Sequence, residues 1–130
     1  MIDPAAFARL LCGYCLDVQA DQQVLVRTTA LAAPVVLALQ RETLERDAWP
    51  LLRTAVPGQE EGFFAAAGAA QLDGISGAAR AETEAADCVP AVDAPDNPRA
   101  LAGVDPEKLM RARRAGAELS EIRLARRWCR

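Results

Sequence analysis

The sequence predicts one α/β domain with three layers, in which a short, mostly parallel sheet of three to four strands has helices on both faces. Three observations support this fold class. The chain has 130 residues, which is the length of a single domain. Short strand-like segments alternate along it with longer segments of helical periodicity. Strands joined in this way by helices form right-handed crossovers, which give a parallel sheet with helices on its faces.

The first helix is predicted to begin at Asp3, which can act as the N-cap, and Pro4 suits the first helical position. Apolar side chains then recur at the spacing of one buried helix face: Phe7, Leu10, Leu11, Tyr14 and Val18. The sequence "VLVRTT" at 24–29 is short and rich in β-branched residues, and it predicts the first strand.

A second helix is predicted over roughly 31–47, with Pro34 in its first turn. Its apolar positions are Val35, Val36, Leu39 and Leu44, whereas its later half is charged and should face solvent. A second strand is predicted over 49–57, where Pro50 suits the start of a strand better than its centre.

Residues 60–87 are rich in alanine and predict two helices, separated at Gly74 and Gly77. A third short strand is predicted at 88–92, and a turn-rich connection follows at 93–103. Together with the segments before them, these elements give the order that is typical of a Rossmann- or flavodoxin-like sheet.

The last helix is predicted to open at Asp105, an acidic N-cap followed by a proline and a glutamate that the helix dipole favours. It should run to about Arg126. The final residues, 127–130, look like the beginning of another strand, so the chain looks cut within an element.

Composition limits the chemistry that this chain can perform. It contains no histidine, which is the commonest general base near neutral pH and a usual ligand of catalytic zinc. It has no apolar run of the ~18 residues that a membrane span requires, and no secretory signal at its start. We therefore expect a cytoplasmic protein with no membrane partner.

The cysteines of "CGYC", Cys12 and Cys15, allow three interpretations: a redox dithiol, half of a zinc site, or packing. A redox pair needs a helix N-terminus that lowers the thiol pKa, but Cys12 lies about nine residues into the predicted helix. A zinc site needs a second pair, but Cys88 and Cys129 are isolated. Packing is favoured, with Cys15 near the apolar face as a small hydrophobic residue.

Other possible motifs are equally weak. The glycines of "DGISGAAR" do not follow the first strand, as a phosphate-binding turn would require. The adjacent carboxylates Glu60 and Glu61 open a helix, where negative charge is stabilising. The serines Ser76 and Ser120 have no histidine partner and no nucleophile elbow. We therefore assign no catalytic, cofactor-binding or metal-binding residue.

Basic side chains concentrate in the last helix and beyond it: Arg111, Arg113, Arg114, Arg123, Arg126, Arg127 and Arg130. The net charge is +4 for residues 105–130 and −7 for residues 1–104. The chain is acidic overall, and no aromatic platform accompanies the arginines. A solvated face or a seam against another part of the protein is therefore favoured over nucleic-acid binding.

Four stretches resemble the N-terminal part of the metal-dependent aminopeptidases of the aminopeptidase T and aminopeptidase S (leucyl aminopeptidase) type. They are "DVQADQQVLVRTT", "LAAPVVLALQRETLERDAWPLLRTAVPG", "AQLDGISGAARAETEAADCVPAV" and, most specifically, "DNPRALAGVDPEKLMRARRAGAELSEIRLARRWC". The family often has glycine where Asp21 stands, a difference that concerns a turn. The resemblance covers nearly all of this chain but only about the first third of a family member.

The resemblance implies that residues 1–130 are the N-terminal α/β domain of an aminopeptidase-like protein whose catalytic domain is absent. The two divalent metals of the family (cobalt, zinc, manganese or magnesium) are held in that later domain, and the full-length enzymes remove N-terminal residues such as leucine from peptides. This chain would then be inactive alone, with no cofactor of its own. It would serve as scaffold, substrate-cavity wall and subunit contact in a homo-oligomer.

Two alternatives come from other classes of protein. The chain could be a free-standing flavodoxin-like module that binds a ligand at the carboxyl ends of its strands, near Thr28, Thr29 and Val56. It could also be an interaction domain that forms homo-oligomers and binds no ligand.

Overall fold

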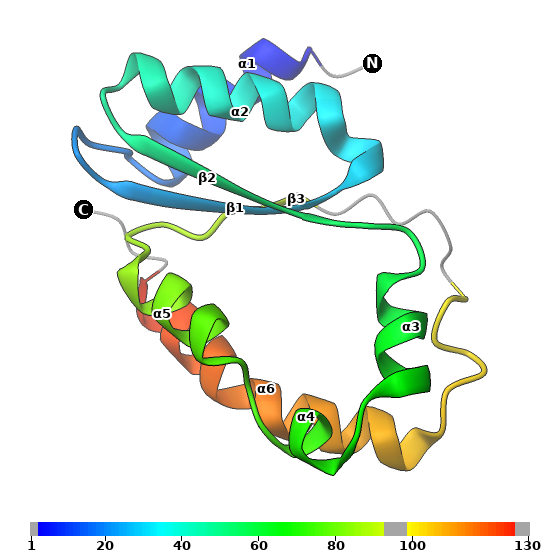
Figure 1. Cartoon of the computed structure of the whole chain (residues 1–130). Helices are drawn as coiled ribbons and strands as arrows, with labels where there is room; N and C mark the ends of the chain where they lie inside the picture. Colours follow the sequence, from blue (N-terminus) through cyan, green and yellow to red (C-terminus); the bar gives the residue numbers. More distant parts are fainter. Residues whose placement is uncertain (1–2, 93–98, 127–130) are drawn as a thin grey trace.

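The computed structural model describes residues 3–92 and 99–126, and a three-stranded parallel sheet lies there between two layers of helices (Figure 1). The strands are β1 (Gln23–Thr29), β2 (Trp49–Ala55) and β3 (Ala91–Val92). The helical segments are α1 (Pro4–Leu10), η1 (Leu11–Cys15), η2 (Ala30–Ala32), α2 (Ala33–Glu45), α3 (Gln59–Ala66), α4 (Ala69–Asp73), α5 (Gly77–Ala85) and α6 (Pro106–Arg126). The three-layer α/β class is thus confirmed. The predicted strand at 127–130 and part of the connection at 93–103 lie outside the described residues.

The strand order is β2-β1-β3, with β1 in the centre. Helix α2 connects β1 to β2 on one face of the sheet, and α1 lies beside it (Figure 1). The segment α3–α5 connects β2 to β3 on the opposite face, where α6 also lies (Figure 1). The chain therefore passes from β1 first to its neighbour on one side, β2, and later to its neighbour on the other side, β3. A sheet whose order reverses in this way has a crevice at the carboxyl ends of the strands.

The hydrophobic core lies between the sheet and the α1–α2 layer. Successive side chains of β1 point to opposite faces of the sheet, and those of Val24 and Val26 point toward this layer. There they pack in one cluster with Val36 and Leu39 of α2. Each such side chain contributes about 1.5–3 kcal/mol when it is fully removed from water. Leu44, which was expected on the same helix face, is exposed instead.

Helix α1 begins as predicted, because Asp3 Oδ1 accepts a hydrogen bond from the Ala5 backbone N–H at 3.1 Å. Its predicted buried face is wrong in part. Ala8 is buried, whereas Leu10 and Tyr14 are exposed. The contact with α2 runs along the small side chains of the helix, which let the two backbones approach closely. Of the other residues that the periodicity selected, Val18 is buried and Leu11 packs against the core, as expected.

The backbone enters β1 and β2 through turns that hydrogen-bond to each other. Asp21 N–H donates to the Asp47 carbonyl at 2.8 Å, and both residues have positive φ, 66° and 59° respectively. This left-handed region favours glycine, and aspartate is among the few other residues that tolerate it. The glycine that the resembled family often has at position 21 is therefore explained by backbone conformation.

The segment predicted as two helices contains three. The additional break falls at Gly68, where the Gln71 side chain reaches back and accepts a hydrogen bond from the Gly68 N–H at 2.8 Å. The predicted break at Gly74 is confirmed, and a Cβ there would lie 2.9 Å from the Ala70 carbonyl oxygen. Ser76 then caps α5.

Helix α6 begins as predicted, with Asp105 Oδ1 accepting a hydrogen bond from the Glu107 N–H at 3.0 Å. It lies against α4 and α5 on the second face of the sheet (Figure 1). No helix within the described ranges combines the length and the apolarity that crossing a bilayer would need.

Candidate functional site

A cavity of about 540 Å³ lies between the sheet and the α5–α6 layer. Its floor comes from the carboxyl halves of the strands, including Thr28 and Thr29 of β1 and Val92 of β3. Glu82 of α5 and Arg123 of α6 form part of its walls. The volume lies within the range of about 300–1,000 Å³ that is typical of small-molecule sites.

The strand geometry explains why this cavity is polar. Residues of β1 alternate between the two faces, so Leu25 and Arg27 point away from the hydrophobic core and toward the cavity. Arg53 of β2 is the partner of Arg27 in the parallel register and lines the same cavity. Two cationic side chains thus lie side by side on one face of the sheet.

Only one of these strand arginines has an ion pair within the described part of the chain. Arg53 Nε lies 3.0 Å from a Glu82 carboxylate oxygen. Burial, and secondarily the positive charge of Arg27, lowers the pKa of the Arg123 guanidinium. Arg123 Nε is shielded from solvent and has no hydrogen-bond partner among the described residues. The cavity therefore holds cationic groups whose charges are incompletely compensated.

The crevice predicted at the carboxyl ends of the strands coincides with this cavity in part. Thr28 and Thr29 line it as expected. Val56 does not line it, because β2 ends at Ala55 and the Val56 side chain is exposed beyond it. The three arginines were not predicted as a group, since the strand register that brings Arg27 and Arg53 together is a tertiary feature.

The C-x-x-C segment forms a π-helical turn, in which Leu16 N–H donates to the Leu11 carbonyl at 2.9 Å. Cys12 is buried in the core beside α2, which supports the packing interpretation for this residue. Cys15 is exposed, so its predicted role as a small hydrophobic residue is wrong. A Cβ at Gly13 would lie 2.9 Å from Nη2 of Arg46, so glycine here lets the guanidinium lie close to the turn.

We expect the two thiols to differ sharply in reactivity. Burial raises the pKa of the Cys12 thiol, an effect that a hydrogen bond with Thr43 partly opposes. Cys15 is exposed to reagents, and alkylation requires both access and the thiolate form. With iodoacetamide at neutral pH, mass spectrometry should find Cys15 modified first, while unfolding in guanidinium should remove the difference. Equal rates in the native protein would contradict this assignment.

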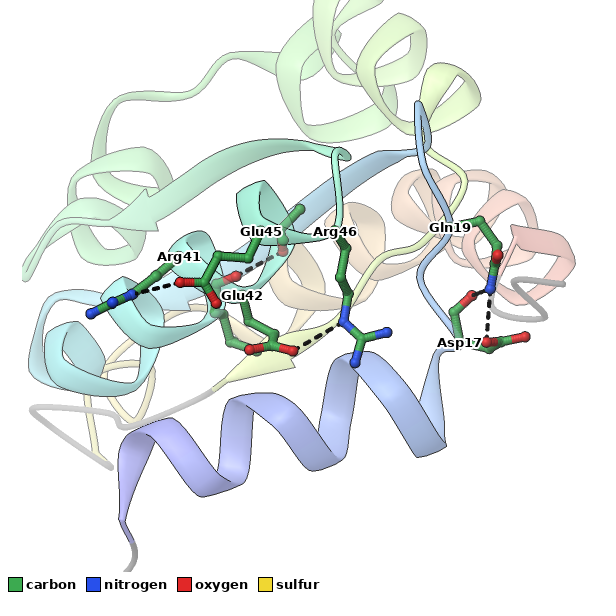
Figure 2. A network of polar contacts seen from close by, with 8 residues as sticks. Asp17, Gln19, Arg41, Glu42, Glu45 and Arg46 are labelled. Atoms are coloured by element: carbon green, nitrogen blue, oxygen red, sulfur yellow. Dashed lines mark hydrogen bonds and ion pairs between the residues drawn. The ribbon is translucent and has the colours of Figure 1, made fainter.

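Charged side chains on α2 form ion pairs along the helix rather than a site (Figure 2). Arg41 pairs with Glu45 at 3.0 Å and Arg46 with Glu42 at 3.1 Å, both four residues apart. Such pairs stabilise helices by a few tenths of a kcal/mol, in the range of about 0.2–0.5. Figure 2 also shows Gln19 turned toward Asp17, to which its amide donates at 2.8 Å.

The basic residues of α6 form a seam with the neighbouring helices. Arg111 Nη2 lies 2.6 Å from an Asp73 oxygen of α4, and this pairing lowers the pKa of Asp73. Glu118 of α6 pairs with Arg80 of α5 through two hydrogen bonds. These contacts support the prediction that the charged side chains in this part of the last helix lie against other parts of the protein. Arg127 and Arg130, and the side chain of Arg126, lie outside the described residues.

Metal-ligand chemistry requires several suitable side chains to converge. Among the described residues, no three histidine, cysteine, aspartate or glutamate side chains are placed where they could hold a metal ion. With no imidazole in the chain, this set of side chains does not fit a two-metal hydrolytic centre. We therefore derive no catalytic step from these residues.

Comparison with known proteins connects the fold to a family. The chain is similar to wild-type AmpT from Thermus thermophilus, with a TM-score of 0.68 and 22% sequence identity. This match covers 93% of the present chain and 32% of that chain, so the present chain spans about a third of AmpT. No curated protein matches the sequence. A family model described as thermophilic metalloprotease (M29) matches residues 4–128, nearly the whole sequence. This confirms the resemblance to metal-dependent aminopeptidases, and the chain belongs to the M29 family of thermophilic metalloproteases.

Proposed function

We propose that this chain is the non-catalytic N-terminal domain of a metallo-aminopeptidase. The observation that carries the proposal is the family match over residues 4–128, taken with the similarity to only 32% of AmpT. The divalent metals of the family would be held by residues outside this chain. In the full protein, a metal-activated water would attack the peptide carbonyl next to a free N-terminus. We propose that the full protein prefers peptides with leucine at the N-terminus.

The role of the domain would be to support the catalytic part, to wall the substrate cavity and to contact other subunits. Large apolar side chains exposed on the α1–α2 layer support a contact role, among them Leu10 and Leu37. Trp49 and Leu51 on the edge strand β2 are exposed as well. A location in the cytoplasm fits this assignment.

We expect the purified chain to be inactive, because its side chains do not supply a two-metal centre. The test is an assay with leucine p-nitroanilide after addition of cobalt, zinc or manganese, with equilibrium dialysis to measure bound metal. Neither turnover above the metal-only blank nor stoichiometric metal binding is expected. Turnover that copurifies with the chain would overturn the proposal. The subunit contact is tested separately, by measuring the mass of the chain in solution with light scattering.

A second candidate function is a free-standing ligand-binding module. The position of the cavity at the carboxyl ends of the strands favours it, because open α/β sheets bind ligands there. A thermal-shift screen of nucleotides tests this candidate. A specific nucleotide that raises the melting temperature by several degrees would support it, and a flat response across the screen would count against it.

A further inference from the structure

The cavity face of the sheet has an unusual charge arrangement. Parallel sheets are normally covered on both faces, and their strands are apolar on both sides. Here Arg27 and Arg53 are partners in the register of β1 and β2, and both line the cavity. Like charges on directly opposed residues destabilise a sheet unless a counter-charge is present. Arg27 is exposed and the Arg53 side chain is 58% exposed, so this face of the sheet presents positive charge to the cavity and to solvent.

The described part of the protein balances only some of this positive charge. Glu82 is engaged with Arg53 at 3.0 Å, so this pair is neutral. Arg27 and Arg123 have no ion-pair partner among the described residues. Glu60 at the start of α3 also lines the cavity and offsets one of the two remaining charges. The lining is left with a net positive charge.

The surroundings of Arg123 make the net positive charge of the lining unfavourable for the fold. Its Nε is shielded from water and lacks an acceptor within the described ranges. A buried N–H without an acceptor lowers the stability of the fold, and the cost is greater when the group is charged. The lowered pKa of the Arg123 guanidinium has burial as its first cause and the charge of Arg27 as its second. Arg123 therefore carries an N–H without an acceptor among the described residues, whereas Arg27, which lines the same cavity, is exposed to solvent.

We propose that this cavity binds a small oxyanion, a carboxylate or a phosphate, between the guanidinium groups of Arg27 and Arg123. Guanidinium groups bind both classes through paired, charge-assisted hydrogen bonds. The segment after β1 lacks the glycine-rich turn that would wrap a pyrophosphate, so a small anion fits better than a dinucleotide. This inference goes beyond the proposed aminopeptidase role and does not depend on it.

Isothermal titration calorimetry of the purified chain tests the proposal. Sodium phosphate and citrate are titrated separately, with ionic strength held constant by sodium chloride. Saturable binding of at least one anion is expected, and the stronger of the two identifies the oxyanion class. Arg27→Met and Arg123→Met should each weaken binding by about tenfold or more, as expected for loss of one charge-assisted contact. The matched control is Arg113→Met, an exposed residue of α6 outside the cavity, which should bind like the unaltered protein.

Melting experiments without added anion separate the proposal from a structural role. Arg123→Met should melt no lower than the unaltered chain, because it removes a charge that Arg27 repels. A clear loss of stability would mean that Arg123 is satisfied within the polypeptide, and it would overturn the proposal. Absence of saturable binding to either anion, or equal weakening by Arg113→Met, would overturn it too.

Discussion

Replacing Val26 by aspartate is expected to abolish cooperative folding. Val26 is 0% exposed at the centre of β1, and it packs in the core against the α1–α2 layer. An unpaired carboxylate there would be desolvated at an effective cost of several kcal/mol, added to the lost apolar contacts. Domains of this kind are stable by only about 5–15 kcal/mol. Circular dichroism of Val26→Asp should show no cooperative thermal transition at neutral pH.

The matched control is Val56→Asp, the same change at a position that is 64% exposed just beyond β2. An exposed carboxylate keeps its hydration, so this variant should melt within a few degrees of the unaltered chain. A cooperative transition of normal height for Val26→Asp would show that β1 is not the central buried strand.

Truncation of Leu39 to alanine should have the next largest effect. Leu39 is 1% exposed on the inner side of α2 and is among the largest fully buried side chains of the described residues. Leucine-to-alanine changes at such positions cost about 2–5 kcal/mol, through lost transfer energy and the cavity left behind. Urea denaturation followed by tryptophan fluorescence or circular dichroism should show a lower midpoint for Leu39→Ala with an unchanged slope.

Leu37→Ala provides the comparison on the same helix. Leu37 is 60% exposed on the outer side of α2, so its truncation should change the free energy of unfolding by no more than about 0.5 kcal/mol. Equal destabilisation by the two variants would mean that α2 presents a different face to the sheet.

The local elements could be predicted because their signals are local. The caps at Asp3 and Asp105 act within two residues, and the structure shows both hydrogen bonds. The parallel order followed from alternating segments and the handedness of crossovers. The buried face of α1 could not be predicted by periodicity alone. The contact with α2 selected small side chains such as Ala8, a choice that depends on how closely two helices approach.

The candidate site was only partly predictable. Thr28 and Thr29 could be placed at the carboxyl edge, because they end a predicted parallel strand. Arg123 lies in the last helix, 96 residues after Arg27 in the sequence, and its approach to Arg27 depends on how that helix crosses the sheet. The sequence showed that arginines concentrate in the last helix. It did not show that Arg111 pairs with α4 whereas Arg123 lines the cavity.

The turn at Asp21 bears on how substitutions in this family should be weighed. Its positive φ restricts the position to residues that accept a left-handed backbone, and its side-chain charge is not what the turn uses. An exchange of aspartate for glycine there preserves the path of the chain into β1. Scoring schemes that penalise such an exchange as a change of polarity would overstate the evolutionary distance between two homologues.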